Sequence, residues 1–295
     1  MNDSTLDWLL EENHPGVRLR TLTDLCGLPD TDARVTTTRA LVVSTLEAAK
    51  DLSWMNEKIL HPIYGLTALA ESGLTRNDVP IDTEVDRLLA QPFDANCGDY
   101  MLLRALVMLG YGTDPRVEER LIRMTDTQLP DGGWLCLHRL EKMTRTPKSC
   151  MKAAMHAVLL AGERQKRGLP NSGGHALVQY FLKRRLCYRM DNPTQLALHA
   201  RPGLRTIDAF FPIEVMRVSL PVLLEALAAL GLGQASELQE AWNMLEAKLD
   251  ALGRISLEGT LPKSYLPKER VGRPGKWVTL YAWLAYKYRR GGIAC

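Results

Sequence analysis

Four apolar runs that each end in a glycine constrain the fold of this chain more than any other feature. They cover residues 66–73, 102–110, 153–162 and 220–231. Their apolar residues recur with the period of a helix, and glycine commonly ends a helix because it adopts a positive φ readily. Amphipathic segments follow these runs after turn residues, at 82–89, 115–124, 174–186 and 235–252. We therefore predict an all-α chain built from helical hairpins.

Further helices are predicted on both sides of these runs. The same periodicity predicts helices at 4–11, 17–25 and 32–52, and a last one at 276–289. We expect a single domain over residues 1–295, in which residues 1–53 form an N-terminal helical extension. A HEAT-like solenoid is an alternative arrangement, because the residues at 14–20 would suit such a repeat.

A sharp turn at residues 128–134 joins two of the predicted helices, and it reads Gln-Leu-Pro-Asp-Gly-Gly-Trp. Proline presets one φ, aspartate hydrogen-bonds its own backbone, and the glycines accept a positive φ. Trp134 then supplies a large apolar anchor.

The pattern Gln-x-x-Asp-Gly-Gly-Trp at 128–134 resembles the repeat motif of the α/α-toroid superfamily. That superfamily contains squalene-hopene-type terpene cyclases and the β subunits of protein prenyltransferases. The resemblance implies an α/α-toroid of inner and outer helices, and the long, uneven loops favour it over the solenoid.

Within such a toroid, the most apolar helices should form the inner ring. The predicted helices at 102–109, 153–160 and 218–230 are apolar on nearly all sides, whereas the helix at 115–124 carries charge on one face. This arrangement gathers the starts of the inner helices around one mouth of the barrel.

Three cysteines and a histidine are predicted to meet at this mouth. Cys97 and Cys150 each open an inner helix, and Cys136 and His138 lie in the loop between them. Thiolates are stabilised at helix N-termini, and three thiolates with an imidazole suit zinc. Prenyltransferases hold zinc with an Asp, a Cys and a His, but this sequence does not reproduce their ligand spacing. The alternative is that each cysteine is a small buried apolar residue.

Basic residues outnumber acidic ones in three loops at the same mouth, at 139–148, 199–208 and 258–276. Cations beside helix N-termini form anion sites, so we expect them to hold a diphosphate-like head whose apolar tail runs into the barrel. The candidate substrate-binding residues are Arg145, Lys148, Arg201, Arg205, Arg270, Arg273, Lys276 and Trp134. The alternative is a solvated charged rim.

Asp99 and Asp208 are candidate catalytic acids or bases, because each lies near the start of an inner helix. A helix cap is the alternative role for both. The Asp-x-Asp-Asp motif of class II cyclases has only an incomplete counterpart at 30–33, and the Asp-Asp-x-x-Asp motif of class I enzymes is absent. Polyene cyclisation by the known acid machinery is therefore not expected.

Composition limits the partners and the compartment. A net charge of +3 makes nucleic acid an unlikely partner. The start has no basic signal region, and the most apolar run, 218–232, is interrupted by polar residues and proline, so we expect no transmembrane segment. Six cysteines without an export signal favour reduced thiols in a cytoplasmic protein.

Together these features predict a prenyltransferase- or terpene-cyclase-like enzyme. It would bind an apolar substrate with an anionic head in a helical barrel, with assistance from zinc. The alternative is a non-catalytic helical-repeat binding or scaffold protein, with structural zinc or none.

Overall fold

The fold is all-α in the part of the chain that the computed structural model describes. It describes residues 2–46, 60–142, 144, 147–171, 174–186, 188–190, 192, 194, 218–259, 266–267 and 269–291. The elements are α1 (Asp3–Leu9), α2 (Pro15–Arg20), η1 (Thr21–Leu25), α3 (Ala33–Thr45), α5 (Leu60–Glu71), α6 (Asp82–Leu89), α7 (Cys97–Leu106), η3 (Val107–Tyr111), α8 (Pro115–Asp126), α9 (Leu137–Leu140), α10 (Met151–Lys166), α11 (Gly174–Leu182), α12 (Leu220–Leu227), η4 (Ala228–Leu232), η5 (Ser236–Leu238), α13 (Gln239–Glu246) and α14 (Lys276–Arg289). Isolated β-bridges join Leu249 to Ile255 and Ser256 to Pro274.

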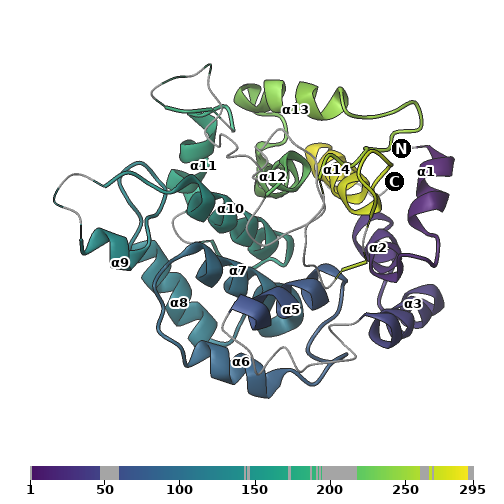
Figure 1. Ribbon diagram of the computed structural model, residues 1–295, viewed down its shortest axis with the longest axis horizontal. Helices are drawn as coiled ribbons and strands as arrows, with labels where there is room; N and C mark the ends of the chain where they lie inside the picture. Colours follow the sequence, from purple (N-terminus) through teal and green to yellow (C-terminus); the bar gives the residue numbers. More distant parts are fainter. Residues whose placement is uncertain are drawn as a thin grey trace.

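The helices are arranged in an inner and an outer group (Figure 1). The inner helices, which lie around the centre of the molecule, are α2, α5, α7, α10, α12 and α14. In this group α5 packs on α7, α7 on α10, α10 on α12, α12 on α14, and α14 on α2 and η1. An ion pair of 3.0 Å between Arg20 and Glu71 joins α2 back to α5. The helices α1, α3, α6, α8, α11 and α13 lie outside them.

Burial follows the predicted division between apolar and amphipathic helices. Every residue of α12 is buried, and α7 is buried from Tyr100 to its end. The amphipathic α8, by contrast, buries only Val117, Arg120 and Met124. Among the described residues, no helix combines the length and the apolar character needed to cross a membrane.

Three of the four predicted glycine ends are confirmed. Gly73, Gly110 and Gly231 have φ values of 80°, 97° and 85° at the ends of inner helices. The prediction for Gly162 is wrong, because α10 continues to Lys166. A Cβ atom at Gly162 would lie 2.9 Å from the Cα atom of Ala226, so this glycine lets α10 approach α12 closely.

A buried group of charged side chains joins the inner helices, near the C-terminal ends of α2, α5, α7, α10 and α12 and in the first half of α14. This ion network consists of Arg20, Glu71, Arg104, Glu163, Lys166 and Glu225 with the hydroxyl of Tyr281. Each inner helix contributes at least one member: α2, α5, α7, α12 and α14 give one each, and α10 gives two.

Glu71 is the centre of the ion network, and its side chain is completely buried. One carboxylate oxygen accepts from Arg104, and the other accepts from Arg20 at 3.0 Å and from the Tyr281 hydroxyl at 2.6 Å. On the other side of Arg104, Lys166 donates to Glu163 at 2.6 Å and to Glu225 at 2.7 Å. These contacts neutralise each buried charge with a partner on another helix or turn.

We predict that Glu71→Gln lowers the free energy of unfolding by about 3–5 kcal/mol, because it removes the carboxylate that Arg20 and Arg104 share and leaves these buried guanidinium groups with only Asp24 and Glu163 as their respective anionic partners. Urea unfolding followed by circular dichroism measures this change. The matched control, Glu119→Gln on the exposed face of α8, should change stability by about 0.5 kcal/mol or less. Equal effects of the two substitutions would contradict the role of the ion network.

We also predict that His156 makes the fold less stable as pH falls. Burial in α10, reinforced by the charges of Arg104 and Lys152, lowers the pKa of His156 from 6.5 to about 3. Between these values the unfolded chain binds a proton that the folded chain does not, so stability decreases from pH 6.5 downwards.

The slope of this loss is at most about 1.4 kcal/mol per pH unit, and His156→Gln should remove it. Unfolding free energies measured for both proteins between about pH 6 and pH 4 check this, because every other titrating group is common to the two proteins. Parallel curves would show that His156 does not titrate as its burial requires.

Candidate metal centre

The loop that carries the candidate ligands is held by the turn at residues 128–134. Leu129 and Gly133 are joined by a backbone hydrogen bond of 2.9 Å, and Gly132 donates to the Leu129 carbonyl at 2.8 Å. The carboxylate of Asp131 accepts from the Gly133 amide at 3.2 Å and from the Ser149 hydroxyl. Asp131 therefore links this turn to Ser149, which lies just before α10.

Trp134 anchors this loop in the core, where it is 2% exposed. Its indole N–H donates to the Met124 carbonyl at 2.7 Å, and its ring packs edge-on against Tyr100 with centroids 5.8 Å apart. The Trp134 carbonyl accepts from the Cys150 amide at 2.7 Å. Trp134, which was predicted to contact substrate, therefore holds the backbone of Cys150 in place.

Cys97 and Cys150 lie at the N-terminal ends of neighbouring inner helices, away from the ion network. Cys97 is the first residue of α7, and Cys150 is the N-cap of α10. Because α7 and α10 pack against each other, two thiols that are far apart in the sequence lie at the starts of neighbouring helices.

The pKa values of the two thiols shift in opposite directions. The interaction with the Cys150 side chain, together with burial, raises the pKa of Cys97. The interaction with Cys97 lowers the pKa of Cys150 to about 5, against the effect of burial and with help from the Ala153 and Lys152 amides. A thiolate is thus stabilised at the start of α10, as expected for a helix N-terminus.

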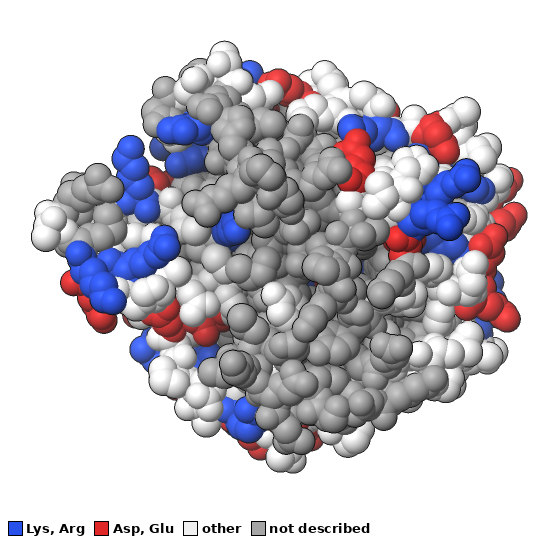
Figure 2. Space-filling model, in the orientation of Figure 1, with Lys and Arg blue, Asp and Glu red and all other residues white. Residues whose placement is uncertain are grey.

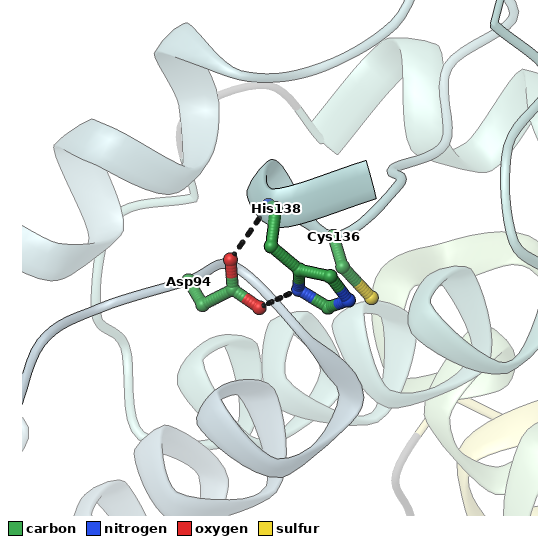
Figure 3. Close-up of side chains that lie close together, drawn as sticks. All are labelled: Asp94, Cys136 and His138. Atoms are coloured by element: carbon green, nitrogen blue, oxygen red, sulfur yellow. Dashed lines mark hydrogen bonds and ion pairs between the residues drawn. The ribbon is translucent and has the colours of Figure 1, made fainter. Parts of the chain in front are cut away.

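Cys136 and His138 approach the same region from the loop and from α9. Burial raises the pKa of Cys136, and the charge of Cys150 raises it further. The His138 ring turns its Nε2 edge toward the sulfur of Cys136 (Figure 3). Among the described residues, Cys136 and His138 form a cluster of possible metal ligands with Asp94, and Cys97 and Cys150 are not part of it.

Asp94, in the loop before α7, fixes the orientation of His138 (Figure 3). One carboxylate oxygen accepts from the His138 amide at 2.9 Å, and the other lies 2.5 Å from Nδ1 of the ring. Burial would raise the pKa of Asp94, but the hydrogen bonds from His138 hold it below its usual value. Since a carboxylate only accepts hydrogen bonds, Nδ1 carries a proton, and in the neutral imidazole the Nε2 lone pair faces Cys136.

Three possible ligand atoms lie close enough together for one metal ion to bridge them. The ligand atoms of Asp94, Cys136 and His138 all lie within 4.8 Å of one another. In tetrahedral zinc, a sulfur and a nitrogen ligand are about 3.6 Å apart. Modest side-chain rotation would therefore bring Cys136 and His138 to zinc-binding distances.

Asp99 has the role of a helix cap. Its carboxylate accepts from the amides of Asp94 at 3.0 Å and Asn96 at 3.1 Å, and Asn96 caps α7 in return. Burial raises the pKa of Asp99. In this position the residue fixes the loop that presents Asp94.

The described basic residues of the predicted anion site differ in exposure. Arg139, Lys142 and Lys148 are exposed around the candidate ligands, and Figure 2 shows basic side chains gathered beside α9. Arg270 and Arg273 are also exposed, in the loop before α14. Lys276, however, is buried, and its ammonium group is held by Glu11 at 2.9 Å and Asn13 at 2.8 Å.

Four other candidate residues lie outside the described part of the chain. They are Arg145, Arg201, Arg205 and Asp208.

Comparisons with family models, with curated proteins and with solved structures find no match for this chain.

We predict that Gly132→Ala destabilises the protein more than Gly168→Ala. Both glycines have a positive φ, 88° and 66°, so alanine costs about 1–2 kcal/mol at either. A Cβ atom at Gly132 would lie 2.1 Å from the Ala176 carbonyl oxygen, whereas nothing lies within 4 Å at Gly168. The clash should add about 1–3 kcal/mol, measured by urea unfolding. Similar losses would show that this turn is not packed as described.

Proposed function

We propose that this protein is an α/α-toroid enzyme with a zinc centre formed by Cys97, Cys136, Cys150 and His138. Its substrate would be an apolar molecule with an anionic, diphosphate-like head, as in prenyltransferases and terpene cyclases. The observation that carries the proposal is the orientation of His138 by Asp94, which turns the Nε2 lone pair toward the Cys136 sulfur.

The chemistry of the donors supports zinc. Three thiolates with one imidazole form a common zinc donor set, and a carboxylate that binds the second ring nitrogen is the usual partner of a zinc-bound histidine. When bound, zinc would supply a Lewis acid that polarises the anionic head. The chain's own part is to hold the thiols at two helix starts and to fix the imidazole through Asp94.

The charges around the candidate ligands support an anionic substrate. Lys148 lies two residues before Cys150 and is exposed, and the positive charge of Lys152 acts on both Cys97 and Cys150. Together with the N-terminus of α10, these cations would attract a diphosphate. Tyr100 adds a buried hydroxyl without a hydrogen-bond partner.

The direction of substrate entry follows from the ion network. Its charged side chains join α2, α5, α7, α10 and α12 near the C-terminal ends of these helices. An apolar tail that displaced these paired charges would raise the free energy strongly, because each charged side chain would then be buried without its partner. The substrate should therefore approach from the N-terminal ends, where the thiols and cations lie.

A scaffold protein with structural zinc is the second candidate, and the number of proposed ligands favours it. Four protein ligands would complete the coordination sphere and leave no position for substrate. Such a zinc would lock the loop of Cys136 onto the starts of α7 and α10.

The zinc centre is tested by metal analysis of protein purified without added metal. We predict about one zinc per chain, lost in Cys136→Ser and His138→Gln. Asp94→Asn should weaken zinc affinity by about 10–100-fold, since it removes the partner that orients the imidazole. Cys26→Ser, which changes a cysteine of the η1 end, is the control and should keep its zinc. Zinc-free wild-type protein would refute the metal centre.

Calorimetric titration with farnesyl diphosphate then separates the enzyme from the scaffold. The enzyme proposal requires binding that Lys148→Ala weakens about tenfold or more and that Arg34→Ala, on the outer α3, leaves unchanged. Pyrophosphate serves as the probe of the head alone. Zinc-loaded protein that binds neither compound would support the scaffold.

A further inference from the structure

We propose that the surface around α9 and the end of α11 binds bilayers that contain anionic phospholipid. We refer to this surface as the basic face, and it consists of the exposed side chains of Arg139, Lys142, Lys148 and Lys183. The inference concerns this surface alone, and it depends neither on zinc nor on the proposed substrate.

Positive charge is concentrated in the two segments that form the basic face. Residues 136–152 and 174–190 contain nine lysines and arginines but a single acid, Glu141. Their net charge of +8 exceeds the net charge of the whole chain, +3, so the remaining residues are net negative. Such an uneven distribution attracts a polyanion to one side of the molecule, although the chain as a whole is close to neutral.

The carboxylate of Asp131 links the two segments. It accepts a hydrogen bond from the Ser149 hydroxyl, and it lies 3.8 Å from the guanidinium group of Arg184. Lys148 and Lys183 directly precede these two residues in the sequence. Figure 2 shows basic side chains along the edge of the molecule where Figure 1 places α9 and α11. The basic face is therefore one continuous region rather than two separate sites.

The acids of this region already have partners. Asp94 pairs with His138 at 2.5 Å, and Glu240 pairs with Arg185 at 3.0 Å. Within the described part of the chain, the four cations of the basic face take part in no ion pair. Their charges are therefore available to an external partner.

The short helix α9 adds an apolar side chain to these cations. Of its two leucines, Leu137 packs against the apolar core and Leu140 does not. Leu140 is partly exposed, and in the sequence it lies between Arg139 and Lys142. A leucine flanked by cations can enter the boundary between lipid headgroups and acyl chains while the cations meet the lipid phosphates.

The aromatic residues of this region favour a bilayer over nucleic acid. Proteins that bind single strands stack the bases on exposed aromatic rings. Here Tyr180 is buried, and the guanidinium carbon of Arg184 lies 3.5 Å from its ring centroid. Arg185 covers Tyr188 in the same way at 4.5 Å. The basic face thus combines cations with a leucine, and these two rings are not open for stacking.

The experiment mixes the full-length protein with sucrose-loaded vesicles and measures the bound fraction by sedimentation. The vesicles contain either phosphatidylcholine alone or phosphatidylcholine mixed with phosphatidylserine. Each basic residue near an anionic surface strengthens binding about fivefold, so four of them should favour the anionic vesicles by roughly 100-fold or more. Raised salt should remove most of this preference, because it screens the charges.

Surface variants locate the binding. Lys142→Ala and Lys183→Ala should each weaken binding to anionic vesicles about fivefold, and the double variant about 25-fold. The matched control, Arg34→Ala, removes the same charge from α3 at the opposite edge of the molecule (Figure 1). It should change binding less than about twofold, because salt screens a charge so far from the lipid. Leu140→Ser should weaken binding about threefold or more without a change in charge.

Equal binding to both kinds of vesicle, or binding to neither, would overturn the inference. Equal losses in Lys183→Ala and Arg34→Ala would also overturn it, since net charge rather than the basic face would then attract the lipid. A DNA oligonucleotide is tested in parallel. If the oligonucleotide bound the protein through Lys183 while the vesicles did not, the basic face would be a nucleic-acid surface and the inference would be wrong.

Discussion

The ion network around Glu71 is the interaction on which the rest of the structure depends. It joins all the inner helices through paired charges and the Tyr281 hydroxyl, deep in the protein. Apolar packing alone would tolerate small sliding of these helices, because hydrophobic contact has no preferred direction. Charges that must each meet a partner allow far fewer arrangements, because a slipped helix would leave one of them unpaired.

The ion network also joins the two helices that carry Cys97 and Cys150. The contact between Arg104 and Glu163 holds α7 against α10. Cys97 and Cys150 lie at the starts of these helices, and the loop held by Trp134 carries Cys136 and His138. Stability and the candidate centre are thus linked through the same two helices.

Local patterns were enough to predict the all-α class and many helix positions, including 82–89 and 276–289 without error. They were also enough to select Cys136 and His138, which the structure places in one cluster with Asp94. The role of Asp94 depends on a contact with a residue 44 positions away, so no local pattern indicates it. The ion network did leave a signal: single acids, such as Glu71 and Glu225, interrupt apolar helices at similar positions. Recognising them as partners required knowledge of which helix faces meet.

The most direct test of this account is X-ray absorption at the zinc edge of the purified protein. The account predicts a four-coordinate zinc with three sulfur ligands at about 2.3 Å and one nitrogen at about 2.0–2.1 Å. Cys150→Ser should lower the sulfur count by one. A first shell of nitrogen and oxygen alone would contradict the convergence of the three thiols, and so would a protein without zinc.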